Sequence, residues 1–123
     1  MNQAGFTLLV RKRSGAAPSD LTGEYHACAF STLLTNYLDG WGSATFSTGN
    51  RLTWSFRANL EGAPLDPASF DLEYGVAADG ATEFRQSGGG LRWLGAVGPA
   101  GGYAIMAGGF HDTAPPLLMV CLR

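Results

Sequence analysis

The stretch from Arg51 to Leu60, RLTWSFRANL, alternates polar and apolar side chains without a break. A β-strand projects successive side chains to opposite faces, so this period of two places Trp54 and Phe56 on one face and Arg57 on the other. A strand of this kind has one buried face and one face in water. The pattern therefore predicts a sheet whose apolar side is turned toward a core.

The rest of the chain repeats this alternation in short segments separated by glycine-rich turns. The 123 residues include 18 Gly and 6 Pro, a composition that argues against long helices. Short strands at regular spacing are typical of a β-barrel or a β-sandwich. We predict an all-β protein, a mostly up-and-down antiparallel barrel of about eight to nine strands, with a β-sandwich as the alternative. The predicted strands are Phe6–Arg13, Gly23–Leu34, Gly42–Thr48, Arg51–Glu61, Ser69–Ala78, Thr82–Ser87, Leu91–Val97, Tyr103–Phe110 and Leu117–Arg123.

Size and charge limit the classes of function. The chain has the usual length of one domain, and its 46% hydrophobic content is enough for a core, so we expect residues 1–123 to form a single domain. A net charge of -2 supplies no basic field to attract nucleic acid or an anionic membrane. No apolar run reaches the roughly 20 residues of a membrane span, and the N-terminus lacks a signal-peptide pattern. We expect a soluble, cytoplasmic protein that binds neither nucleic acid nor membrane.

Cys28 and Cys121 are the only cysteines, and both fall in predicted apolar strands. In the absence of an export signal, two buried free thiols are the favoured interpretation. A disulfide between the two predicted strands is the alternative.

Three predicted strands, residues 6–13, 103–110 and 117–123, carry apolar side chains on both faces. Such strands must be covered on both sides. The barrel interior covers one side, and either a loop or a second copy of the chain must cover the other. Because the chain has no spare helix, we predict a homodimer with a two-fold contact. The first and last of these runs are also expected to lie side by side and close the barrel.

The segment Leu21-Thr22-Gly23-Glu24-Tyr25 resembles the strand openings of avidin-type barrels. Together with the rhythm of short strands and glycine turns, it is similar to the calycin group, which includes lipocalins and avidins. This resemblance implies a barrel with a pocket for a small molecule. It assigns no binding residues, because the chain does not reproduce an avidin biotin site, and the Gly-x-Trp opening of lipocalins has no counterpart in the first strand.

The aromatic side chains are the candidates for a binding site. A barrel of about eight strands either fills with side chains or holds one small molecule, so the rings either form the core or line a pocket. Small residues such as Ala58 on the same strands favour some free space among the rings. We predict an apolar or aromatic ligand, with Arg57 as an anchor for a carboxylate should it point inward. The predicted ligand-binding residues are Trp54, Phe56, Trp93, Tyr25, Tyr74, Arg57 and His26.

Motifs for metal binding or catalysis are incomplete. Glu24, His26 and Cys28 are spaced to project side by side from one strand, but His111 is the only other histidine, so we predict no metal site. The glycine-rich runs are not followed by the Lys-Ser/Thr of a phosphate loop, and the chain contains no Gly-x-Ser-x-Gly motif. We predict no cofactor and assign no catalytic residue.

Three hypotheses of function follow, in order of preference. The first is a small-molecule-binding barrel without enzymatic activity. The second is a structural or protein-interaction module that works through its apolar outer strands. The third is an isomerase or cyclase that folds its substrate inside the barrel, for which Glu24, His26 or His111 would supply the titratable group.

Overall fold

A computed structural model describes residues 14–33, 36–88, 90–108 and 117–123. The predicted strand Phe6–Arg13 and the candidate His111 lie outside these residues. The described chain forms nine strands and two short 3-10 turns, which confirms the all-β prediction. The strands are β1 Gly23–Leu33, β2 Asn36–Ser47, β3 Arg51–Leu60, β4 Ala63–Pro64, β5 Ala68–Val76, β6 Ala81–Gln86, β7 Arg92–Val97, β8 Tyr103–Gly108 and β9 Leu117–Leu122, and the turns are η1 Pro18–Asp20 and η2 Pro99–Gly101.

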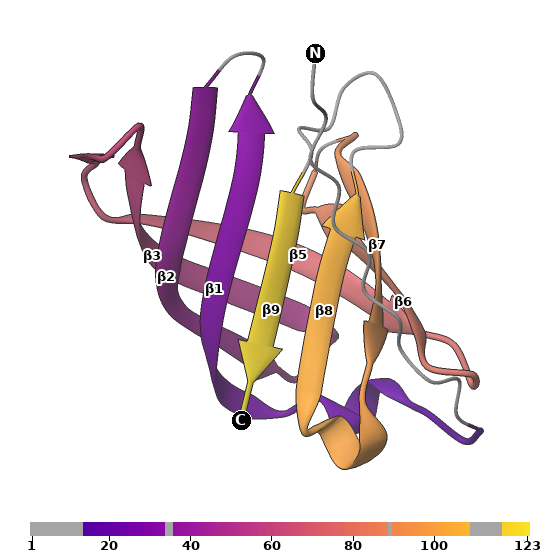
Figure 1. The fold of residues 1–123 in the computed structure, drawn as a ribbon. Helices are drawn as coiled ribbons and strands as arrows, with labels where there is room; N and C mark the ends of the chain where they lie inside the picture. The colour runs from indigo at the N-terminus through magenta and orange to yellow at the C-terminus, as the bar shows by residue number, and fades with distance from the viewer. Residues whose placement is uncertain (1–13, 34–35, 89, 109–116) are drawn as a thin grey trace.

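Eight of the strands close into an antiparallel up-and-down barrel. Each pairs with the next along the chain, from β1 through β3 and β5 to β9, and β9 pairs back with β1. The short β4 pairs with the last two residues of β3, Asn59 and Leu60. Figure 1 shows β1, β9 and β8 side by side on the near wall, while β3 and β5 cross behind them. The barrel prediction is therefore confirmed over the sandwich alternative.

Closure gives each strand an inner and an outer face, and the alternation in the sequence matches them. On β3, Leu52, Trp54 and Ala58 are buried, whereas Arg51 and Arg57 are exposed. Other strands continue the same inner layer. The core includes Tyr25, Ala27, Ala29, Ala44, Phe46, Leu72, Tyr74, Phe84, Trp93, Val97, Met106, Met119 and Cys121.

Two local features differ from the prediction. β2 begins at Asn36 rather than at Gly42, and β4 was not predicted. The turn at Asp79-Gly80 joins β5 to β6, and of these two residues only Gly80 has positive φ, whereas a type I′ turn needs positive φ at both.

One end of the barrel is packed shut. The rings of Tyr25 and Phe46 meet edge to face at 5.1 Å between centroids, and Phe46 meets Tyr74 in the same way at 5.3 Å. The Tyr25 hydroxyl donates to the carbonyl of Gly101 in η2 at 2.5 Å, and the Tyr74 hydroxyl donates to the carbonyl of Leu21 at 3.3 Å. The glycine-rich segment 98–102 packs against this end, because Gly101 is buried and its carbonyl accepts the hydrogen bond from Tyr25.

The two cysteines lie on adjacent strands but on opposite faces. Ala27 pairs with Cys121, and Cys28 pairs with Val120, so Cys121 points inward and Cys28 points outward. Both thiols are free, and the prediction that both are buried is wrong for Cys28. Burial raises the pKa of Cys121 to about 12 and keeps this thiol protonated at neutral pH.

Within the described residues, no helix is long and apolar enough to cross a membrane.

Gly95 marks a place where two strands approach too closely for a side chain. A Cβ atom at this position would overlap the carbonyl oxygen of Ile105, whereas a Cβ atom at Gly75 would have no neighbour within 4 Å. We expect Gly95→Ala to lower the free energy of unfolding by about 1–3 kcal/mol, because backbone must shift to admit the methyl group. Gly75→Ala is the matched control, with a change near zero or slightly stabilising. Urea titrations measure both, and equal midpoints for the two variants would contradict the close approach.

The closed end predicts a loss of stability at alkaline pH. Burial raises the pKa of Tyr25 and of Tyr74 above their ordinary value, although Arg123 over the Tyr25 ring partly opposes this. The folded state therefore keeps these phenolic protons more tightly than the unfolded chain. The stabilisation that the two protonated phenols contribute to the folded state is complete below about pH 10, and it is lost as the pH rises above that value. In urea titrations from about pH 8 to 11, we expect Tyr25→Phe and Tyr74→Phe to reduce the decline of the unfolding free energy with rising pH. A decline as steep in both variants as in the parent would rule out the two phenols as its source.

Candidate functional site

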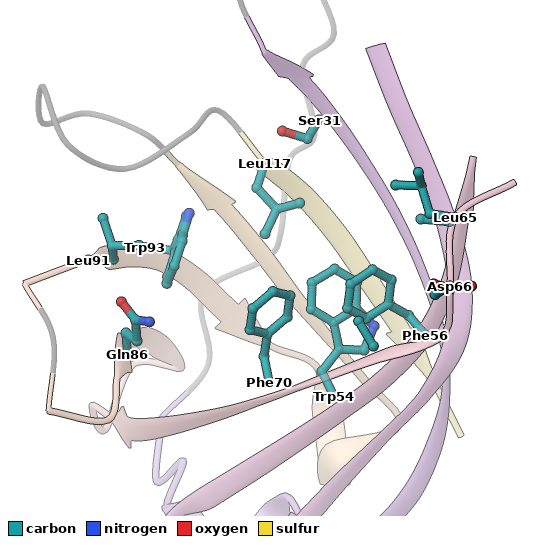
Figure 2. A pocket seen from close by; sticks show the side chains of 12 residues that line it. Ser31, Trp54, Phe56, Leu65, Asp66, Phe70, Gln86, Leu91, Trp93 and Leu117 are labelled. Carbon is teal, nitrogen blue, oxygen red and sulfur yellow. The ribbon is translucent and has the colours of Figure 1, made fainter. Parts of the chain in front are cut away.

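A pocket occupies the open end of the barrel, opposite the Tyr25–Phe46–Tyr74 cluster. Its volume is about 360 Å³, at the lower end of the roughly 300–1,000 Å³ typical of small-molecule sites. Figure 2 shows the side chains converging from strands on both sides of the mouth. The lining residues are Ser31, Trp54, Phe56, Ala58, Leu65, Asp66, Ala68, Phe70, Gln86, Leu91, Trp93 and Leu117.

Three aromatic rings, with Phe56 stacked between Trp54 and Phe70, form one wall of the pocket. The rings of Trp54 and Phe56 stack at 4.4 Å with 23° between their planes, and Phe56 stacks on Phe70 at 5.4 Å and 15°. The register explains this grouping, because Trp54 and Phe56 are two residues apart on β3 and Phe70 of β5 pairs directly with Trp54. The wall therefore presents flat apolar faces and edges to the pocket.

The opposite wall is also apolar. Trp93 lies on β7, Leu91 lies just before that strand, and Leu117 begins β9; Figure 2 shows their side chains at the pocket. Two of the small residues in the lining, Ala58 and Ala68, leave the space between these walls open. The pocket exists because large rings alternate here with methyl-sized side chains.

The lining contains few polar groups. Asp66 is the only ionisable residue among the described residues that line the pocket, and Ser31 and Gln86 are neutral. No lysine, arginine or histidine of the described chain is among them, so the described part of the lining offers no cation to an anionic ligand. An anionic ligand would lose its hydration without gaining an opposite charge from the described lining.

The indole nitrogen of Trp54 does not add a polar contact. Its Nε1 atom is buried and has no hydrogen-bond partner among the residues that the structure describes. The atom is also inaccessible to solvent, so a ligand in the pocket meets the carbon atoms of this ring. Burying this donor without a partner lowers the free energy of unfolding by about 1–3 kcal/mol.

The seven residues predicted to bind a ligand fall in three places. Trp54, Phe56 and Trp93 line the pocket. Tyr25 and Tyr74 lie in the cluster at the closed end. Arg57 and His26 are exposed on the outside of the barrel, so Arg57 does not point inward as a carboxylate anchor.

His26 and Arg57 line a second, shallow depression on the outside of β1, β2 and β3, with a volume of about 430 Å³. Glu24 lies in the same depression, and Cys28 is exposed farther along β1. The described chain contains no group of three or more His, Cys, Asp or Glu residues placed to hold a metal ion. Glu24 and His26 also lie outside the barrel, so neither supplies the interior titratable group that the isomerase or cyclase hypothesis requires.

No protein-family model matches this chain, and no curated protein matches it. The assignment of a function therefore rests on the geometry of the pocket.

Several lining residues were missed by the sequence analysis. The signal for Phe70 was present, because the predicted strand 69–78 places it on the same face as Leu72 and Tyr74. Leu65 and Asp66 follow β4 in a segment without regular periodicity. Their place at the mouth depends on how this segment folds back along β3, where the amide of Leu65 donates to the carbonyl of Ala58 at 2.8 Å.

Trp54 and Phe70 contribute differently to the fold, although both line the pocket. Trp54 belongs to the core and is 5% exposed, whereas Phe70 is 48% exposed. We expect Trp54→Ala to cost about 3–5 kcal/mol of unfolding free energy and Phe70→Ala to cost less than about 1.5 kcal/mol, because its ring is already half in solvent. Urea titrations check both values. Similar losses for the two variants would mean that the rings are equally part of the core.

Proposed function

We propose that this barrel binds one small, uncharged, largely aromatic molecule in the pocket at its open end. The observation that carries the proposal is an apolar pocket of about 360 Å³, walled by stacked rings, in a barrel whose other end is packed shut. A ligand that enters the mouth can slide its flat face against the stacked rings, which favour offset or edge contacts. The closed end limits the depth that the ligand reaches.

Exposed apolar groups at the mouth support this proposal. Phe70 and Leu65 line the pocket and are among the large hydrophobic side chains left exposed in the described chain. A bound ligand would remove part of this surface from water. Each Å² of apolar area removed contributes about 25 cal/mol of favourable transfer free energy. The eight-stranded up-and-down barrel is also compatible with the calycin resemblance, whose lipocalin and avidin members hold one small ligand inside.

The neutral probe N-phenyl-1-naphthylamine tests the proposal. We expect one probe to bind per chain, with probe fluorescence excited through Trp54 and Trp93. Ala68→Trp should weaken binding about tenfold or more, because a new indole fills the mouth without removing a lining ring. Ser69→Trp is the matched control, since it adds the same ring one residue away on the outer face of β5. An equal effect of the two variants on binding, or none from Ala68→Trp, would exclude the pocket as the site.

A second arm tests the preference for uncharged ligands. 2-Naphthol and 2-naphthoate have the same ring system and differ in charge at neutral pH. We expect the carboxylate to compete with the probe less well, because the described lining contains Asp66 and no cation. Tighter binding of 2-naphthoate would contradict an uncharged ligand while leaving the pocket itself in place.

A further inference from the structure

The outside of the barrel is divided into two unlike walls. On β3, β5 and β6 the outward side chains are polar and paired with one another. Thr53 donates to Asp71 at 2.8 Å, and Glu83 forms ion pairs with Arg85 at 3.5 Å and with Arg92 of β7 at 2.7 Å. On β9, β8 and β7 the outward side chains are mostly apolar, and this surface continues onto Cys28 and Phe30 of β1 and Trp41 of β2; we call this face the apolar wall. Its larger members are Trp41, Phe30, Leu118, Val120, Leu122 and Leu94.

Strand register places the apolar wall in two continuous rows. One row runs across four strands, in which Leu118 pairs with Phe30 and with Ala107, and Ala107 pairs with Leu94. The other runs across five strands, with Trp41 next to Cys28, followed by Val120, Ile105 and Ala96. The residues named in the two rows are uncharged, and the first row is bounded by Asp39 of β2, which pairs with Phe30, and by Glu83 of β6, which pairs with Leu94. Side chains this close on one face form a single surface.

The exposed hydrophobic side chains of the described chain are concentrated in two places. Two of them, Leu65 and Phe70, belong to the mouth of the pocket. The other four, Phe30, Trp41, Leu94 and Leu122, lie on the apolar wall and are each about half exposed. Ile105, in the middle of the wall, is already buried. Large contiguous apolar patches on soluble proteins commonly mark interaction surfaces.

We infer that the apolar wall docks against the same wall of a second copy of this chain. A two-fold axis brings each residue near the axis against its own copy, so charges there would repel, and the two uncharged rows avoid this. Charged and polar groups lie at the border of the wall, where His26 pairs with Leu122, and Glu83 pairs with Leu94. An apolar centre with a polar rim is the usual arrangement of a dimer interface.

The dimensions of the wall suit a weak dimer. Five strands about 4.8 Å apart and six residues long give a face of roughly 24 by 20 Å. Its area of about 480 Å² per partner is below the ~800 Å² that a standard-size interface buries, so we expect a weak dimer that forms at high protein concentration. A twisted antiparallel sheet also packs well on another of the same twist, at about 10 Å separation.

Sedimentation velocity of the full chain over a range of concentrations tests the inference. We expect a species of twice 12.9 kDa at high concentration. Phe30→Glu and Leu94→Glu should each weaken the dimer about tenfold or more, because each buries an unpaired carboxylate at the interface. Ser55→Glu is the matched control, since it adds the same charge to an exposed outward position on the polar wall, and it should leave the dimer intact. Thermal melting followed by circular dichroism confirms that all three variants fold.

Cys28 provides an independent measurement, because it lies in the second row between Trp41 and Val120. We expect its reaction with a maleimide to slow as the protein concentration rises, and Phe30→Glu should abolish this dependence. The buried Cys121 stays unlabelled in the folded chain, so it does not obscure the signal.

A monomer at millimolar concentration, or equal weakening by Ser55→Glu, would overturn the inference. A monomer that co-sediments with phosphatidylcholine vesicles would also overturn it and would assign the wall to a lipid surface. The probe binding at the mouth does not depend on any of these outcomes.

Discussion

The pairing of β9 with β1 is the constraint on which the rest of the structure depends. Six residue pairs, from His26 with Leu122 to Ser31 with Leu117, join the last strand to the first described one. This pairing removes the two long edges of the sheet, which would otherwise present unpaired N–H and C=O groups. It also separates an inside from an outside, and only then does alternation along a strand decide which side chains are buried and which meet water or a partner.

The inside is filled unevenly, and this unevenness creates the pocket. At the closed end, three rings meet edge to face and two hydroxyl groups reach backbone carbonyls of segments that cross the end. At the open end the rings stack on one wall and face Trp93 and Leu117 across a gap. Ala58 and Ala68 occupy positions where larger side chains would fill this gap. The positions of large aromatic and small alanine side chains along the strands thus decide which end of the barrel is hollow.

The sequence predicted the parts of this arrangement that depend on local pattern. Alternation identified the inner residues of β1, β3 and β5, and the glycine-rich turns separated the strands along the chain. It also placed Cys28 on the face opposite Tyr25, although the general tendency of cysteine to be buried led to the wrong prediction for that thiol. The closed end could not be predicted, because it depends on contacts such as Tyr25 with Gly101, which are 76 residues apart. The same holds for Leu65 and Asp66, whose segment has no periodicity to place it at the mouth.

The alternation that buries one face also lets the two proposed surfaces vary separately. Leu117 lines the pocket, and Leu118, the next residue on β9, belongs to the apolar wall. On β1, Ser31 and Phe30 divide in the same way. A substitution at one position of such a pair changes one surface and leaves the side chains of the other in place, because the strand backbone is held by ladder hydrogen bonds on both sides. Both surfaces therefore share the same strands, and each can change in sequence without altering the other.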